Sequence, residues 1–134
     1  MVHQTIQKVL DKLKKYPETE YELTENSITV LPKNEKGFPV TLTVHVGNSF
    51  TVAYDFWHEE FENEDEALNC LAFGLSEECR LKLTKRGQQP YKWTVEYYDE
   101  GAWREDSTTG LFNLKFWKKS KVIYLQNDLI KNNK

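Results

Sequence analysis

Apolar and polar residues alternate along two segments of the chain. In residues 91–97 the odd positions are aromatic or aliphatic and the even positions are polar. Residues 38–46 repeat this pattern, with apolar side chains at even positions and Thr41, Thr43 and His45 between them. A period of two residues is typical of an antiparallel strand with one buried and one solvated face. Both segments are therefore predicted to be strands of an antiparallel sheet.

Shorter segments with strand-like character surround these two. We expect strands over residues 21–23, 28–30, 102–105, 111–117 and 122–125. A further strand over 50–57 would place Phe50, Val52, Tyr54 and Phe56 on one face, and Asp55 and Trp57 on the other. Gly47 and Asn48 accept positive φ easily, which predicts a tight hairpin between residues 46 and 50.

Two segments have helical periodicity instead. Apolar residues between Val2 and Tyr16 recur at helical spacing, and Pro17 ends that segment. A second helix is predicted to begin at Asn63, a favourable N-cap followed by acidic residues at 64–66. Gly74 weakens the centre of this helical segment, which would allow the helix to stop there. Residues 76–84 are ambiguous, although the alternation of Cys79, Leu81 and Leu83 favours a strand.

This order of elements predicts an α+β fold. Two helices would pack on a largely antiparallel sheet, either strongly curved or split in two, in the order α-β4-α followed by four or five strands. No linker-like stretch divides the 134 residues, so we expect residues 1–134 to form a single domain.

The charge of the chain is modest but uneven. The formal net charge is −3, which disfavours general affinity for nucleic acid. Residues 55–66 contain seven carboxylates and no Lys or Arg, whereas residues 80–92 contain five basic residues and no acid. Such runs usually form solvated faces. Nucleic acid is consequently an unlikely partner, although the basic hairpin at 80–92 keeps that alternative open.

Known chemical motifs offer little. The sequence contains no GxGxxG, GxxxxGK[ST], HExxH or GxSxG motif. We therefore expect no cofactor. Cys70 and Cys79 do not have the spacing of a zinc site and are predicted to be buried, free and unreactive. Without an apolar leader or a stretch of roughly 20 apolar residues, we expect a cytoplasmic protein that contacts no membrane.

The densest group of polar and aromatic residues is the segment 55–62. As a ligand or partner site, Trp57 would supply an apolar wall and His58 a polar contact, with Asp55 and Glu59 beside them. A small hydrolase or isomerase using His58 with Asp55, Glu59 or Glu60 is the catalytic alternative. A metal site would need a second histidine, but the hairpin pairing places His45 next to Thr51 and away from His58. The simpler interpretation is an exposed histidine in an acidic loop.

A second possible surface is aromatic. Trp93, Trp103 and Trp117 fall in successive predicted strands, and Trp117 is out of phase with the apolar residues around it. Tyr98 is likewise out of phase with Trp93. These residues form either a patch for a ligand or partner protein, or ordinary cross-strand pairs. No catalytic arrangement is stronger than its structural alternative. We therefore expect a non-catalytic binding or interaction module for a protein partner or a small ligand.

Overall fold

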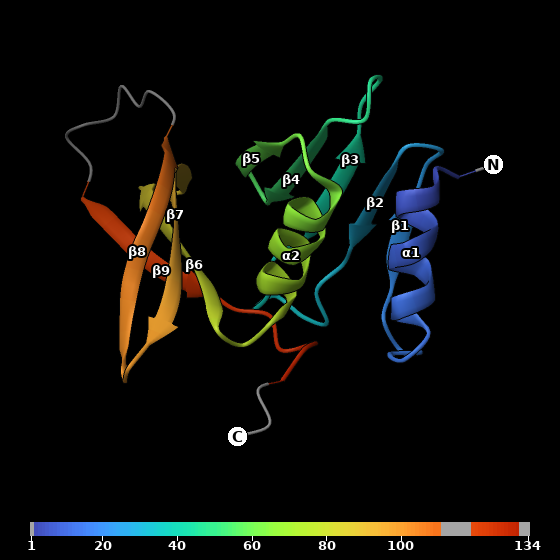
Figure 1. Cartoon of the computed structure of the whole chain (residues 1–134). Helices are drawn as coiled ribbons and strands as arrows, with labels where there is room; N and C mark the ends of the chain where they lie inside the picture. Colours follow the sequence, from blue (N-terminus) through green and yellow to red (C-terminus); the bar gives the residue numbers. More distant parts are fainter. Residues whose placement is uncertain (1, 111–118, 132–134) are drawn as a thin grey trace.

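The computed structural model describes residues 2–110 and 119–131 and has an α+β fold (Figure 1). Two helices accompany two antiparallel sheets of five and four strands. The elements in chain order are α1 (Gln4–Leu13), β1 (Tyr21–Leu23), β2 (Ser27–Val30), β3 (Val40–Val44), β4 (Phe50–Tyr54), β5 (Trp57–Phe61), α2 (Glu64–Leu75), β6 (Cys79–Arg86), β7 (Gln89–Asp99), β8 (Ala102–Gly110) and β9 (Ser120–Leu125). The prediction of an α+β fold with a largely antiparallel sheet, curved or split in two, is confirmed, with five strands rather than four before α2.

The first sheet is a meander in the order β1-β2-β3-β4-β5. Its last strand is a correction to the sequence analysis, which continued one strand from residue 50 to residue 57. The chain instead turns at Asp55, which has a φ of 56°, and Trp57 pairs with Tyr54. Aspartate tolerates this left-handed conformation better than most residues. The turn reverses the predicted faces, because Phe56 is 60% exposed and Trp57 is only 3% exposed.

The second sheet has the order β8-β7-β6-β9. Residues 79–86 form strand β6, in agreement with the alternation of Cys79, Leu81 and Leu83. Strand β8 extends to Gly110, which is further than the four residues predicted for it. The strand predicted over residues 111–117 lies outside the described residues.

Local capping explains where the helices begin. The Asn63 side chain accepts a hydrogen bond from the Glu66 backbone N–H at 3.0 Å, which confirms the predicted N-cap of α2. The His3 ring caps α1 in the same way, through the backbone N–H of Thr5 at 3.1 Å. Gly74 does not end α2, which continues to Leu75. No helix of the described residues is long and apolar enough to cross a membrane.

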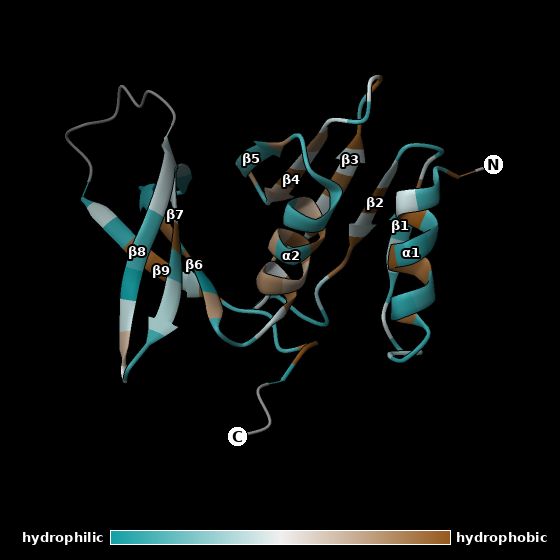
Figure 2. Cartoon of the chain, in the orientation of Figure 1, coloured by the Kyte–Doolittle hydropathy of each residue, from teal (hydrophilic) through white to brown (hydrophobic). Residues whose placement is uncertain are grey.

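The core lies between the two helices and the first sheet and continues into the second sheet. Helix α2 packs on β3, β4, β5 and β6 and contributes Ala67, Leu71 and Leu75 to the core. Figure 2 shows hydrophobic colouring on both α2 and the neighbouring strand β3. The segment after β9 returns to this core. There the buried Asn127 side chain accepts from the Phe38 N–H at 3.1 Å and donates to the carbonyls of Phe38 at 3.0 Å and Gly74 at 2.9 Å. The end of the described chain is thereby attached to two distant segments.

Candidate functional site

Asp55 and Trp57, both predicted at a binding site, lie in the contact between the two sheets. The Trp57 indole N–H donates to the Ser107 hydroxyl at 2.8 Å. The Trp93 indole N–H donates to an Asp55 carboxylate oxygen, also at 2.8 Å. Each sheet thus supplies one tryptophan that bonds to the other sheet. The predicted placement of Trp57 on the solvated face is wrong, because the strand containing Tyr54 ends before it.

His58 and Glu59 lie on β5 and are exposed. His58 Nδ1 is 3.3 Å from the Phe56 carbonyl oxygen, and His58 pairs across the sheet with Ala53. His58 and Glu59 are consecutive in a strand, so their side chains point to opposite faces. His45 Nε2 is 2.7 Å from the Thr51 hydroxyl, which agrees with the predicted pairing. The role of His58 and Glu59 in binding stays a prediction. Trp117, the remaining predicted site residue, lies outside the described residues.

Two large cavities among the described residues lie elsewhere. One has a volume of about 920 Å³ and the other of about 960 Å³, and neither is lined by Asp55, Trp57, His58 or Glu59. Among residues 2–110 and 119–131, no cluster of three or more His, Cys, Asp or Glu side chains is suited to hold a metal ion. Neither of these two cavities therefore places the predicted residues of segment 55–62 in a pocket.

A more ordered group of side chains lies on the second sheet, on the face opposite Leu81, Trp93 and Val95. We call this the outer face. Strand register places these described residues on it: Arg80, Lys82, Thr84, Lys92, Thr94, Glu96, Tyr98, Trp103, Glu105, Thr108, Val122 and Tyr124. It combines basic, aromatic and acidic side chains on neighbouring strands.

Arg80 lies at the centre of the outer face. Its Nε is 2.5 Å from Glu96 Oε1, and this pair joins β6 to β7. The guanidinium carbon is 4.4 Å from the ring centroid of Trp103 and 4.0 Å from that of Tyr124. A planar cation can bond to a carboxylate and stack on aromatic rings at the same time. The pair explains how Glu96 can be buried on a face that the sequence pattern predicts to be solvated.

The aromatic side chains around Arg80 remain accessible. Tyr98 is 50% exposed, Tyr124 is 49% exposed and Val122 is 41% exposed. Tyr98 meets Trp103 edge to face, with 5.4 Å between the ring centroids. Tyr98 is exposed and Trp93 is buried, which confirms the prediction that the two are out of phase. The grouping of Arg80 with Trp103 and Tyr124 was missed, because it depends on the register of three strands that are distant in sequence.

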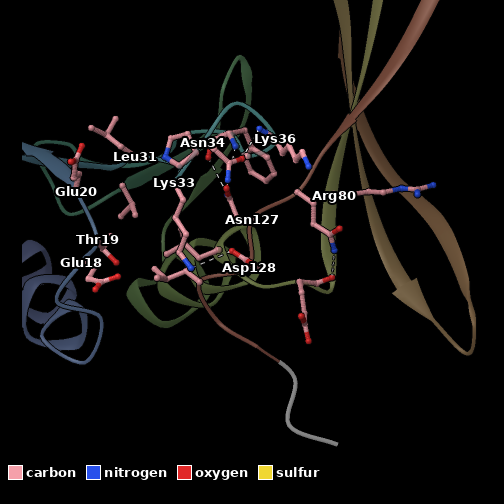
Figure 3. Close-up of a pocket in the computed structure, with 18 of the residues that line it drawn as sticks. Glu18, Thr19, Glu20, Leu31, Lys33, Asn34, Lys36, Arg80, Asn127 and Asp128 are labelled. Carbon is pink, nitrogen blue, oxygen red and sulfur yellow. Dashed lines mark hydrogen bonds and ion pairs between the residues drawn. The ribbon is translucent and has the colours of Figure 1, made fainter.

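The outer face continues into the cavity of about 920 Å³, since Arg80 and Tyr124 form part of the cavity wall (Figure 3). The opposite wall is the β2–β3 connection, including Lys33 and Lys36. Lys33 is paired with Asp128, with 3.6 Å between Nζ and Oδ1. The cavity is thus lined by apolar side chains, paired charges and an edge of the aromatic group.

Comparison with known proteins adds no family to this description. No family model matches the chain, and no curated protein or solved structure is significantly similar to it. Its function must therefore be argued from the arrangement of its own residues.

Proposed function

We propose that this chain is a non-catalytic protein-binding module that docks through the outer face of the β8-β7-β6-β9 sheet. The observation that carries the proposal is the stack of Arg80 between Trp103 and Tyr124, flanked by the half-exposed ring of Tyr98. Arginine, tryptophan and tyrosine supply a large share of the binding free energy at protein interfaces. Together they offer a partner both apolar area and hydrogen-bonding groups.

The rigidity of this group favours binding. Arg80 has a long side chain with several rotatable bonds, and ordering such a side chain at an interface normally costs roughly 0.5–1.5 kcal/mol. Here the ion pair with Glu96 and the two rings already hold the guanidinium in one place. A partner would consequently meet a surface whose main side chain is ordered before binding.

The charges around the outer face indicate the chemistry of the partner. Arg80 is neutralised by Glu96, and Lys82 Nζ is 3.6 Å from Glu105 Oε1. Lys92 on the outer face is exposed and has no ion pair with another described residue. The same holds for Lys119, just before β9, and for Lys121 in β9, whose register places it on the opposite face of the sheet. The uncompensated charge is therefore positive. It favours a protein segment that carries acidic as well as apolar side chains.

The two other functions considered from the sequence have less support. Nucleic-acid binding through residues 80–92 needs several free cations along a phosphate backbone, and two of the five basic residues are paired with acids of the same sheet. Catalysis by His58 needs an enclosing pocket, and neither large cavity reaches that residue. Protein binding is the hypothesis that uses the ordered group formed by Arg80, Trp103 and Tyr124.

The test compares the wild type with two double variants that add the same charge. Tyr98→Glu with Tyr124→Glu alters the outer face, whereas His45→Glu with His58→Glu alters exposed positions of the first sheet. Each immobilised protein, once shown to be folded, is offered a phage-displayed library of random linear peptides. We expect acidic, apolar peptides to be enriched on the wild type, to bind the outer-face variant at least about tenfold more weakly, and to bind the control variant unchanged.

Other results would overturn the proposal. If the outer-face variant binds the selected peptides as tightly as the wild type, the outer face is not the docking surface. If only the His45/His58 variant loses peptide binding, the docking surface lies on the first sheet. Failure of the wild type to enrich any peptide would also contradict the proposal. Tight, salt-sensitive binding of single-stranded oligonucleotides in place of peptides would show that the surface serves nucleic acid.

A further inference from the structure

The backbone of β9 has hydrogen-bonding groups on the open edge of the second sheet. The Tyr98 N–H donates to the Glu78 carbonyl at 2.9 Å, so even-numbered residues at this end of β6 bond to β7. The odd-numbered residues Leu81 and Leu83 must then bond to β9, where their partners are Leu125 and Ile123. It follows that the N–H and C=O groups of Val122 and Tyr124 point away from β6.

Gln126, two residues after Tyr124, supports the outward direction of the Val122 and Tyr124 backbone groups. The Gln126 N–H, which belongs to the same outward series, donates to the Lys36 carbonyl at 2.7 Å. A segment from another part of the chain thus already bonds to one end of this edge. Within residues 2–110 and 119–131, no backbone hydrogen bond outside the sheet reaches Val122 or Tyr124. Two consecutive outward positions are left open to an incoming backbone.

The other strand edges carry features that discourage pairing. Strand β8 has a register irregularity opposite Val95 and Glu96, with three consecutive charged residues at 104–106. Strand β5 has charged or polar residues at 58–60 and lies beside β7 and β8. Strand β1 has only three residues. Bulges, charges and shortness are the means by which proteins protect sheet edges.

Strand β9 is less protected than these edges. It pairs with β6 without a register shift over the pairs from Leu81↔Leu125 to Arg86↔Ser120. Its last four residues, 122–125, are Val-Ile-Tyr-Leu, which favour extended backbone. Val122 and Tyr124 are also members of the outer face, so the open backbone edge and the exposed aromatic surface meet at the same two residues.

We infer that the partner binds as an additional strand along β9. The inference rests on the proposed function and specifies how that surface is used. Backbone hydrogen bonds at Val122 and Tyr124 would give affinity, and the alternate side chains of the added strand would contact the outer face. Acidic side chains on the other face of the added strand would lie near Lys121, and near Lys119 just before β9. One end of the strand would reach the cavity lined by Tyr124 and Lys36.

The test uses the peptides selected on the wild type and a pair of matched variants. Val122→Pro deletes one outward N–H without removing a bond to β6, and edge strands tolerate proline at such positions. Val122→Thr keeps the N–H and the β-branched shape. We expect Val122→Pro to weaken peptide binding by about tenfold, which corresponds to roughly 1.4 kcal/mol. Binding to Val122→Thr should remain within about twofold of the wild type.

A second arm protects the test against misfolding of the proline variant. The selected peptide is N-methylated at one backbone position at a time and bound to the unmodified protein. Because only every second residue of an added strand bonds to β9, methylation should weaken binding at alternate positions. Sensitivity without this alternation would contradict strand addition.

The outcomes separate this inference from the proposed function. If Tyr98→Glu with Tyr124→Glu abolishes binding but Val122→Pro and N-methylation do not, the outer face binds partners without an added strand, and only the inference falls. If the outer-face variant also binds normally, both fall. Self-association of the wild type that disappears in Val122→Pro would identify a second copy of this chain as the occupant of the edge, and would overturn the assignment to a foreign segment.

Discussion

Gly74 shows how a single missing atom allows α2 to lie directly on the first sheet. A Cβ at this position would be 2.3 Å from Cε1 and 2.7 Å from Cζ of Tyr54. Tyr54 cannot move easily, since it is fully buried and its hydroxyl donates to the Cys70 carbonyl of the same helix. The glycine that the sequence analysis treated as a weak point in the helix is thus required by close packing.

We predict that Gly74→Ala destabilises the protein by about 1–3 kcal/mol, the usual cost of forcing an extra methyl group into a packed core. This loss exceeds the gain in helix propensity, which is about 1 kcal/mol. Urea denaturation measures the difference. Asn69→Ala, at an exposed position of α2, is the control and should leave stability unchanged or slightly raised. A Gly74→Ala protein as stable as the wild type would contradict this packing.

The cysteines give a prediction about pH. Burial raises the pKa of Cys70 to about 11 and raises that of Cys79 further. Because the thiolate is the reactive form, labelling of native protein near neutral pH should be slow. The Cys70 rate should increase as pH approaches 11. The raised pKa also stabilises the fold below the ordinary thiol pKa of 9.0, and this contribution should disappear as pH rises from about 9 toward 11. Rapid labelling of both thiols at neutral pH would contradict burial.

Removing one partner of the Arg80–Glu96 ion pair on the outer face should lower the free energy of unfolding. Arg80→Met alone leaves the Glu96 carboxylate buried without its cation, and we expect a loss of about 3 kcal/mol. Adding Glu96→Leu removes the orphaned charge and should recover most of that loss. The free energies of unfolding of the two single variants and the double variant measure the coupling. Additive losses would show that the pair contributes little.

At the scale of elements, the two sheets are joined by reciprocal indole hydrogen bonds. Trp57 bonds to Ser107 of β8, and Trp93 bonds to Asp55 in the turn after β4. Phe56 lies against the Trp93 ring, with 5.0 Å between centroids. Asp55 and Trp57, two of the residues predicted at a binding site, therefore join the two sheets.

Trp57→Phe should test this junction. The smaller ring keeps most of the apolar contact but loses the hydrogen bond to Ser107, and we expect a loss of about 1–3 kcal/mol from the bond and the volume removed. Ser107→Ala removes the same bond from the other side. In the Trp57→Phe background, Ser107→Ala should have almost no further effect on the free energy of unfolding. Full additivity of the two losses would mean that the bond is unimportant.

The elements themselves were largely readable from the sequence, whereas contacts between elements were not. Alternation identified β3, β6 and β7, and the Asn63 cap located α2. The turn at Asp55 was missed because the apolar pattern continues through it and no Gly or Pro marks it. The Arg80–Glu96 pair depends on the register of β6 against β7, which is set by the tight turn at Gly87 and by the register shift at Thr84/Lys85. The predicted loop over residues 86–90 does not specify that register.

At the scale of the whole molecule, Asn127 connects three parts of the chain. Its amide satisfies the N–H and C=O of Phe38 and the carbonyl of Gly74 in a buried position. A Cβ at Gly37 would lie 2.4 Å from the same amide oxygen, so the chain passes very close to it. This contact ties the segment after β9 to the β2–β3 connection and to the end of α2.

We predict that Asn127→Ala destabilises the protein by several kcal/mol, at about 1–3 kcal/mol for each buried group left without a partner. Asp128→Ala is a neighbouring control that removes only an exposed ion pair with Lys33, and it should be nearly neutral. Thermal unfolding ranks the two variants, and hydrogen exchange at Phe38 should accelerate only in Asn127→Ala. Equal stability of both variants would contradict this role.

The position of Asn127 also bears on the order in which the protein is made. Its partners Phe38 and Gly74 precede it by 89 and 53 residues, so both leave the ribosome long before it does. Until Asn127 follows, the backbone groups of Phe38 and Gly74 have no amide to bond, and the contact between the β2–β3 connection, the end of α2 and the segment after β9 cannot form. Although domains begin to fold from the N-terminus during synthesis, we expect a nascent chain halted before residue 127 to remain sensitive to protease, and one released after residue 131 to become resistant.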